Sequence, residues 1–150
     1  MKPKTPKALL HGHENLFSDI EVIVSLGGGI GEDAKLLADI ARPHFKKEEE
    51  YALPPLSLLS ALADGNWHFE SKEAIEMANK LQTELLEMKK EHLEIFHVLK
   101  NLELLAEKEN NEKVKRFVSD LKLHIEVEEQ VLYPATMFIG DYLCHPQFKN

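Results

Sequence analysis

The chain has 150 residues, about the length of one domain, and its 18 basic and 26 acidic side chains give a formal net charge of -8. An acidic chain without a basic patch is not expected to bind nucleic acid or an anionic membrane surface, and its apolar runs are too short for a transmembrane helix. The one cysteine, Cys144, excludes an intramolecular disulfide, so we expect a cytoplasmic protein.

The first half of the chain has helical periodicity with clear breaks. Thr5, which precedes a proline, predicts the N-cap of a first helix. The glycines within residues 27–31 predict the end of that helix, and the acidic residues from 32 onward predict the start of a second one. The second helix is expected to end at Pro54, and the apolar run over residues 56–62 predicts one or two further helical turns.

The second half of the chain is predicted to form two longer helices. Ser71 is placed to cap the first of them, which carries an apolar stripe as far as the turn predicted at residues 110–111. The last helix is expected to run from this turn to Pro134, and we treat residues 135–150 as a C-terminal tail.

Four amphipathic helices joined by mostly short links are typical of one fold class. We predict an all-α fold, an up-down-up-down four-helix bundle with a short extra helical segment between the second and third helices. The bundle is expected to form a single domain over residues 1–150, with its core at about residues 6–134.

One motif, His-x3-Glu-Glu-x4-Pro, occurs twice in the sequence. Its first copy has His44, Glu48, Glu49 and Pro54, and its second copy has His124, Glu128, Glu129 and Pro134. A His and a Glu four positions apart lie on one face of a helix, so each pair can present a nitrogen and an oxygen to one point. Both pairs lie within apolar stripes, where a carboxylate is costly unless a positive charge compensates it. The motif therefore predicts a metal-binding arrangement that is used twice.

The other two helices each carry one histidine on their apolar face, His13 on the first and His92 on the third. At about 1.5 Å of rise per residue, the two histidines of each hairpin lie within roughly one helical turn of the same height. Four imidazoles and two carboxylates are thus predicted to meet in one region of the core. The predicted metal ligands are His13, His44, Glu48, His92, His124 and Glu128.

This set of ligands favours a borderline transition metal such as iron, manganese or zinc over calcium or magnesium. Six side chains are too many for one tetrahedral zinc with an open position, and they suit two ions. Each ion would then have two histidines, and Glu48 and Glu128 would bridge the pair. A bound hydroxide or oxide would further lower the charge of two divalent ions.

In their order along the chain, these residues resemble the hemerythrin-like family, also called the HHE cation-binding domain. The resemblance covers His13, His44-x3-Glu48, His92 and His124-x3-Glu128, with the paired glutamates and the proline in both halves. It implies a four-helix bundle that holds two iron ions without haem, bridged by an oxide or hydroxide, with zinc or manganese as substitutes. It also implies a reaction with dioxygen, peroxide or nitric oxide.

Two departures separate this chain from the oxygen-carrying members of the family. Phe96 stands where those proteins have a fifth histidine, and Glu128 stands where they have an aspartate. With fewer histidines, both metals would keep open positions, which favours binding or sensing of oxidants over reversible oxygen carriage.

Several alternatives remain open at the level of sequence. The same centre could serve a peroxidase or oxidase, so whether the protein is an enzyme is undecided. An iron-responsive interaction module without catalysis, or a structural bundle filled with zinc, would need the same ligands. His11 is a substitute ligand if the first helix is rotated, and His97 is one position out of phase with the predicted site.

Overall fold

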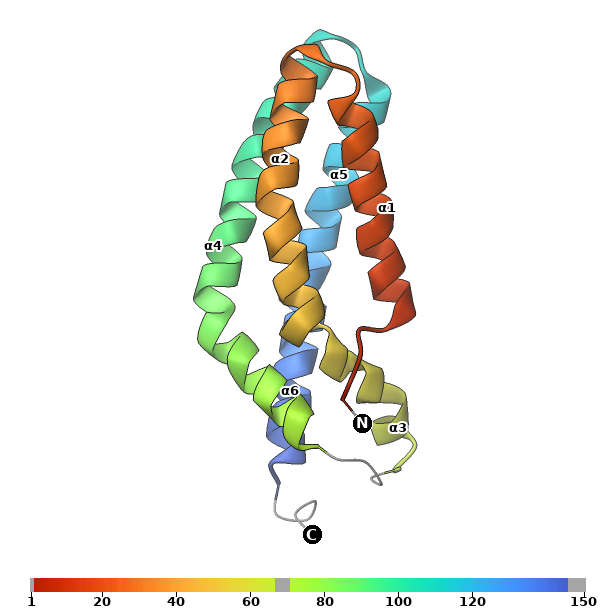
Figure 1. The fold of residues 1–150 in the computed structure, drawn as a ribbon, viewed down its shortest axis with the longest axis vertical. Coiled ribbons are helices and arrows are strands. Elements are labelled where there is room, and N and C mark those ends of the chain that lie inside the picture. Colours follow the sequence, from red (N-terminus) through yellow and green to blue (C-terminus); the bar gives the residue numbers. More distant parts are fainter. Residues whose placement is uncertain (1, 67–70, 146–150) are drawn as a thin grey trace.

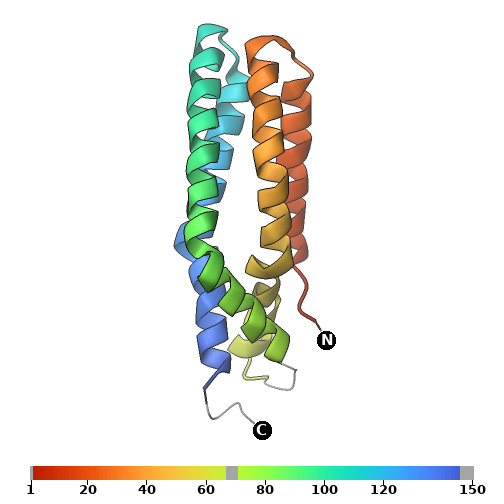
Figure 2. The ribbon, with the colours of Figure 1, turned by 60° about the vertical axis from the view of Figure 1, so that its left-hand side comes forward.

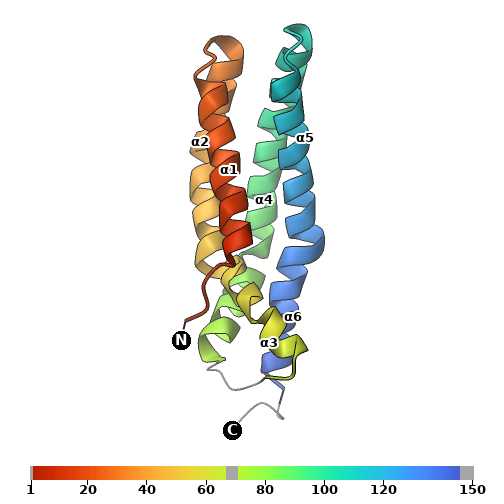
Figure 3. The ribbon, with the colours of Figure 1, turned by 90° about the vertical axis from the view of Figure 1, so that its right-hand side faces the viewer.

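The computed structural model describes residues 2–66 and 71–145, and these residues form helices and turns without a strand. The main helices are α1 (Lys7–Val24), α2 (Gly28–Lys47), α4 (Lys72–Lys108) and α5 (Glu112–Val127). Figure 1 shows that α1, α2, α4 and α5 run up, down, up and down along the long axis. Figures 2 and 3 show the hairpins α1–α2 and α4–α5 packed side by side, which confirms the predicted four-helix bundle.

The turn between α1 and α2 is tighter than predicted. Gly27 and Gly28 have φ angles of 68° and 60°, values that glycine adopts without steric strain. The chain therefore reverses within three residues, and α2 begins at Gly28 instead of near residue 32. Gly31 is inside the helix, where an added Cβ atom would lie 2.8 Å from the carbonyl oxygen of Val24.

Thr5 does not cap α1 as predicted. Pro6 occupies the N-cap position, and no side chain there accepts a hydrogen bond. The Thr5 hydroxyl instead donates to the backbone carbonyl of Glu49, 3.1 Å away. This contact ties the N-terminal segment to the π-helix that directly follows α2.

Each copy of the repeated motif contains a π-helix that begins at its first glutamate. These are η1 (Glu48–Ala52) after α2 and η3 (Glu128–Leu132) after α5. In both, the residue five positions later donates its backbone N–H to that glutamate's carbonyl, so the backbone is one residue wider than an α-helix. Such bulges often occur at functional sites.

The backbone conformation differs between the prolines that close the two copies of the motif. Pro54 is followed by a second proline, which disfavours α-helical backbone at the residue before it. The chain therefore changes to the 3-10 helix η2 (Pro54–Leu58) and the short helix α3 (Leu59–Ala63), as the sequence predicted. Pro134 is followed by Ala135 and falls in the first turn of α6 (Tyr133–Leu143), where a missing backbone N–H is tolerated.

The C-terminal tail predicted from residue 135 is therefore helical as far as Leu143. Ile139 and Leu143 on α6 are buried against Leu53 and Leu56, in an apolar cluster at the lower end of the bundle. Figure 3 shows α3 and α6 at this end, away from the two hairpin turns.

The second hairpin turn agrees with the prediction. Asn110 has a φ angle of 53°, and the side chain of Asn111 accepts a hydrogen bond from the backbone N–H of Val114 at 3.1 Å. A large apolar cluster, which includes Ile20, Leu37, Leu99 and Leu121, fills the bundle between these turns and the polar site below.

Candidate metal centre

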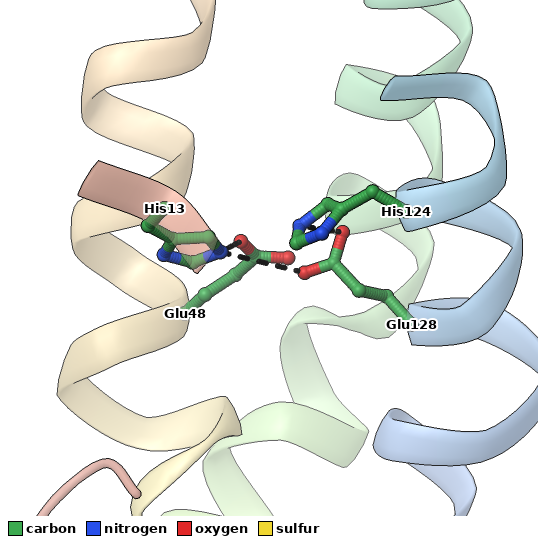
Figure 4. Close-up of side chains that lie close together, drawn as sticks. All are labelled: His13, Glu48, His124 and Glu128. Atoms are coloured by element: carbon green, nitrogen blue, oxygen red, sulfur yellow. Dashed lines mark ion pairs between the residues drawn. The ribbon is translucent and has the colours of Figure 1, made fainter. Parts of the chain in front are cut away.

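All six predicted ligands lie together in the interior of the bundle. Each main helix supplies one histidine, and the first residue of each π-helix supplies a glutamate. Figure 4 shows four of the six side chains, with His13 and His124 on opposite sides of Glu48 and Glu128. Five of the six side chains are at most 3% exposed, and the sixth, His124, is 21% exposed. The i, i+4 spacing brings each His and Glu of the motif together, as predicted. Nε2 of His44 lies 3.1 Å from Oε1 of Glu48, and Nε2 of His124 lies 3.3 Å from Oε1 of Glu128.

The ligands form two groups of four that share both carboxylates. One group contains His13 and His124 with Glu48 and Glu128, and the other contains His44 and His92 with the same glutamates. Within each group, the ligand atoms all lie within 4.8 Å of one another. Glu48 directs Oε2 at Nε2 of His13, 3.2 Å away, and Oε1 at Nε2 of His44. Each carboxylate can therefore serve two positions at once.

Several buried polar atoms of the site have no hydrogen-bond partner. They are His13 Nε2, Glu48 Oε2, His92 Nδ1, His124 Nε2 and both carboxylate oxygens of Glu128. Buried polar groups are nearly always hydrogen-bonded, and an uncompensated buried carboxylate is costly. Five of these six atoms face the space between the glutamates and the histidines, so the donor set fits cations bound there.

The two carboxyl groups carry opposite pKa shifts. Burial and the charge of Glu48 raise the pKa of Glu128 well above its ordinary value. Burial opposes ionisation of Glu48 as well, but the polar groups of Glu128, His13, His44 and His92 that lie close to its carboxylate outweigh burial and hold the pKa of Glu48 well below its ordinary value. Without metal, Glu128 therefore keeps its proton to a higher pH than Glu48 does, and a cation bound between them would displace that proton.

The pKa shifts of the histidines also differ in direction. Burial lowers the pKa values of His13 and His44, but contacts with Glu48 and a second carboxylate outweigh burial and raise both. Burial lowers the pKa of His124 to about 4. His124 is therefore neutral near pH 7, the form in which imidazole binds a metal.

Three further carboxylates contact the outer nitrogens of the histidines. Glu49 lies 2.9 Å from Nδ1 of His13, Glu91 lies 3.0 Å from Nδ1 of His44, and Glu129 lies 3.5 Å from Nδ1 of His92. Carboxylates in this position orient a ligating imidazole and increase its basicity. Glu49 and Glu129 belong to the repeated motif, whereas Glu91, which also pairs with Lys47 at 2.6 Å, was missed by the sequence analysis.

Tyr133 was also missed by the sequence analysis. Its fully buried hydroxyl donates to Oε1 of Glu48 and lies 3.4 Å from Nε2 of His92. Burial raises the pKa of Tyr133, so the hydroxyl keeps its proton for this bond. Its position five residues after Glu128 is a weak signal, because only the π-helix turns this side chain toward the site.

The remaining histidines lie elsewhere. His11, His97 and His145 are exposed, and His68 lies outside the described residues. The large apolar side chains on the four main helices differ in burial: Met88 is fully buried and Phe117 is 5% exposed, whereas Phe17, Leu85 and Phe96 are partly buried. The ring closest to a ligand is Phe45, which stacks on His13 with centroids 4.2 Å apart.

The fold and the site define a four-helix bundle with a buried histidine and carboxylate cluster that can hold metal. The family model described as Hemerythrin HHE cation binding domain matches residues 6–136, so the chain belongs to this family. Comparisons with curated proteins and with solved structures gave no match. Across the described residues, no helix is both long and apolar enough to cross a membrane.

Proposed function

We propose that this protein binds two iron ions and uses them to bind or sense dioxygen or a related oxidant. His13 and His124 would hold one ion, His44 and His92 the other, and Glu48 and Glu128 would bridge them. The observation that carries this proposal is that both groups of four ligands share the same two carboxylates. Two independent single-metal sites would not need shared ligands.

The number of donor atoms supports binding of a small molecule. Four histidine nitrogens and four carboxylate oxygens supply four protein donors for each of two ions, fewer than iron commonly accepts. The chemistry that iron supplies when bound is redox chemistry with dioxygen, peroxide or nitric oxide. The chain lacks the fifth histidine of oxygen carriers, since Phe96 stands at that position, and this favours sensing or reaction over carriage.

The surrounding side chains suit a site that limits water. Phe45 is buried and stacks on His13, Met88 is buried one helical turn before His92, and Tyr133 supplies one hydrogen bond to Glu48 in this apolar setting. The hydroxyl has one proton, so it would donate to an oxygen atom of a small ligand only in place of Glu48. Cytoplasmic location is the environment that we propose for such a centre, in keeping with a single exposed cysteine.

The test is metal analysis of protein purified without added metal, followed by its absorption spectrum in air. We expect two irons per chain and charge-transfer bands of a bridged pair, both absent from a His44→Ala/His124→Ala double variant. The exposed His97 provides the matched control, because His97→Ala should keep both irons. Zinc alone in the wild type, or full iron binding by the double variant, would overturn the proposal.

Catalysis is separated from binding by a second measurement. Steady-state consumption of peroxide with an electron donor, lost in the double variant, would identify a peroxidase. A spectrum that responds to oxidants without turnover would identify a binder or sensor.

A further inference from the structure

A cluster of oxidisable side chains packs against one side of the candidate metal centre. Its buried members include Tyr51, Met77, Met88 and Tyr133, and the partly buried Met137 packs against them. The chain has four methionines and three tyrosines, so three of the four and two of the three gather here. Methionine fills many protein cores, but methionine and tyrosine are also among the side chains that are oxidised most readily. We call these five residues the Tyr-Met cluster.

Tyr133 forms the inner end of the Tyr-Met cluster. Its hydroxyl donates a hydrogen bond to Oε1 of Glu48. Its ring stacks on the ring of His92, with centroids 5.8 Å apart and an angle of 11° between the planes. The fully buried Tyr133 therefore contacts two of the six predicted ligands, so an electron that leaves its ring has a short path to ions held by them.

Tyr51 forms the outer end of the cluster. Its hydroxyl donates to the sulfur of Met88, 3.5 Å away, and Met88 lies one helical turn before the ligand His92. Tyr51 and Met77 also line a surface pocket of about 980 Å³, a volume that suits a small molecule. Four lysines and four glutamates line the same pocket, so their charges balance and a neutral molecule suits it better than an ion. The cluster thus joins the metal centre to this pocket.

The two tyrosines differ in the group that accepts their proton. A phenol that loses an electron becomes a strong acid, so it is oxidised more easily when a base already accepts its hydrogen bond. The hydroxyl of Tyr133 faces the carboxylate of Glu48, which can take the proton along this bond. The hydroxyl of Tyr51 faces a thioether sulfur, which is a weak acceptor. Tyr133 is therefore placed for reversible oxidation, and Tyr51 is not.

We propose that Tyr133 relays single electrons to the metal centre from a small neutral phenol in the pocket beside Tyr51, in a reaction that reduces peroxide. This inference rests on the proposed iron centre and names its electron donor. Iron, when bound, supplies the chemistry that breaks the O–O bond. Hydrogen peroxide takes up two electrons and two protons in this step and leaves as two waters.

The two electrons return to the centre one at a time through Tyr133. In each step its ring gives up one electron, its hydroxyl proton passes to Glu48, and a neutral tyrosyl radical remains. A phenol in the pocket then reduces this radical through the cluster, and the proton returns from Glu48 to Tyr133. The proton that the phenol releases replaces one that the peroxide consumed. Two phenols thus become two phenoxyl radicals for each peroxide reduced.

Electron paramagnetic resonance of the iron-loaded chain tests the relay. After hydrogen peroxide is added without a phenol, rapidly frozen wild type and Tyr51→Phe should both show a tyrosyl radical, which ring-deuterated tyrosine should narrow. Tyr133→Phe should not show it, and added phenol should remove it from the wild type. Tyr51→Phe is the matched control, because it removes a hydroxyl of the same cluster that donates to sulfur. A radical that persists in Tyr133→Phe, or is lost in both variants, would overturn the proposal.

Steady-state kinetics separate a relay from a structural role. In Tyr133→Phe, kcat/KM for the phenol should fall about 10-fold or more and kcat/KM for peroxide should be unchanged, because only the return of electrons uses the relay. Equal loss of both would indicate a disturbed metal site and would overturn the relay.

The position of the phenol is tested by filling the pocket. Glu76 is exposed and lines it, so Glu76→Trp should change kcat/KM for the phenol and leave the radical formed by peroxide alone intact. Glu87→Trp, at an exposed position of the same helix, is the control. Equal phenol kinetics in both variants would overturn this position.

Metal analysis separates this inference from the proposed function. A chain that binds no iron would overturn both. Iron-loaded protein whose spectrum responds to peroxide, but which forms no tyrosyl radical, would overturn the relay alone.

Discussion

The two groups of ligands differ in how tightly the protein encloses them. His44 and His92 are each 1% exposed and have carboxylates, Glu91 and Glu129, at their outer nitrogens. On their side of the site, Tyr133 donates a hydrogen bond to Oε1 of Glu48, the oxygen that faces His44. The second group pairs the buried His13 with His124, which is 21% exposed. One half of the centre is therefore closed and the other is partly open.

The surface beside the more open group supports this contrast. A pocket of about 280 Å³ reaches His13 and is lined by Phe17, Arg42 and Phe45 among others. Removing solvent and fixing ligand orientation both strengthen metal binding, whereas exposure allows exchange. We infer that the enclosed group holds its metal more tightly and that small molecules arrive on the side of His13 and His124.

The largest effect is expected from a change that removes a shared ligand. Glu48→Ala should abolish binding of both metals, because each group loses a bridging oxygen. The metal-free form of this variant should be less stable than the metal-free wild type, by about 1 kcal/mol or more, because His13, His44 and Tyr133 lose the buried carboxylate that they contact. Metal analysis and urea unfolding check both results. Retention of one tightly bound metal would show that the carboxylates are not shared.

Single histidine variants test the contrast itself. His44→Ala should weaken metal binding more than His124→Ala, because it opens the enclosed group and leaves Glu91 without its imidazole. We expect His124→Ala to keep about one metal per chain. Calorimetric titration of metal into metal-free protein gives the two affinities. Equal losses of metal affinity in the two variants would show that burial of a group does not determine how tightly it binds metal.

Removing an outer carboxylate should give a smaller effect. Glu91→Gln should weaken the tighter binding event about 10–100-fold, because His44 loses the group that orients it. Glu94→Gln, at an exposed position of the same helix, is the control and should bind as the wild type does. If both variants bind equally, Glu91 has no role at the site.

The metal-free protein should lose stability as the pH rises above about 6.5. His13, His44 and Glu128 have raised pKa values in the folded state, so they hold protons that the unfolded chain has already released. Stability therefore falls as the pH rises through their folded pKa values. Metal affinity should change in the opposite direction, because binding displaces these protons.

Urea unfolding and metal titration at pH 6.5 and pH 8 measure these two trends. His124 lowers the stability of the metal-free protein at acidic pH. Its pKa in the folded state is about 4, so as the pH falls below the ordinary pKa of histidine the unfolded chain binds this proton before the folded chain does. Metal-free stability that rises between pH 6.5 and pH 8 would contradict the assignment of protons to the site.

The smallest effect is expected at Tyr133. Tyr133→Phe removes the hydroxyl that contacts Glu48. It should weaken metal binding by the enclosed group by about 1–2 kcal/mol, without loss of either metal. Tyr51→Phe is a suitable control, because its hydroxyl donates to the sulfur of Met88 instead of to a ligand. The same loss in both variants would indicate a general packing effect.

The clustering of these histidines and glutamates was predictable because their spacing is local. A His and a Glu four positions apart meet on any helix, and an imidazole within an apolar stripe must face the core. Glu91 and Tyr133 were not predictable in this way, because their contacts with His44 and Glu48 join different helices. Each depends on how the helices are rotated relative to one another.

The sequence by itself determined the four-helix class, the short segment after α2 and the set of side chains that meet in the core, because helical periodicity orients each residue within its own helix. Tertiary structure decided where α2 begins, that the chain stays helical beyond Pro134, and which group of ligands is enclosed. These features depend on backbone angles at Gly27, on the widened turn at Glu128 and on packing between helices, and residue spacing within one helix carries no information about them.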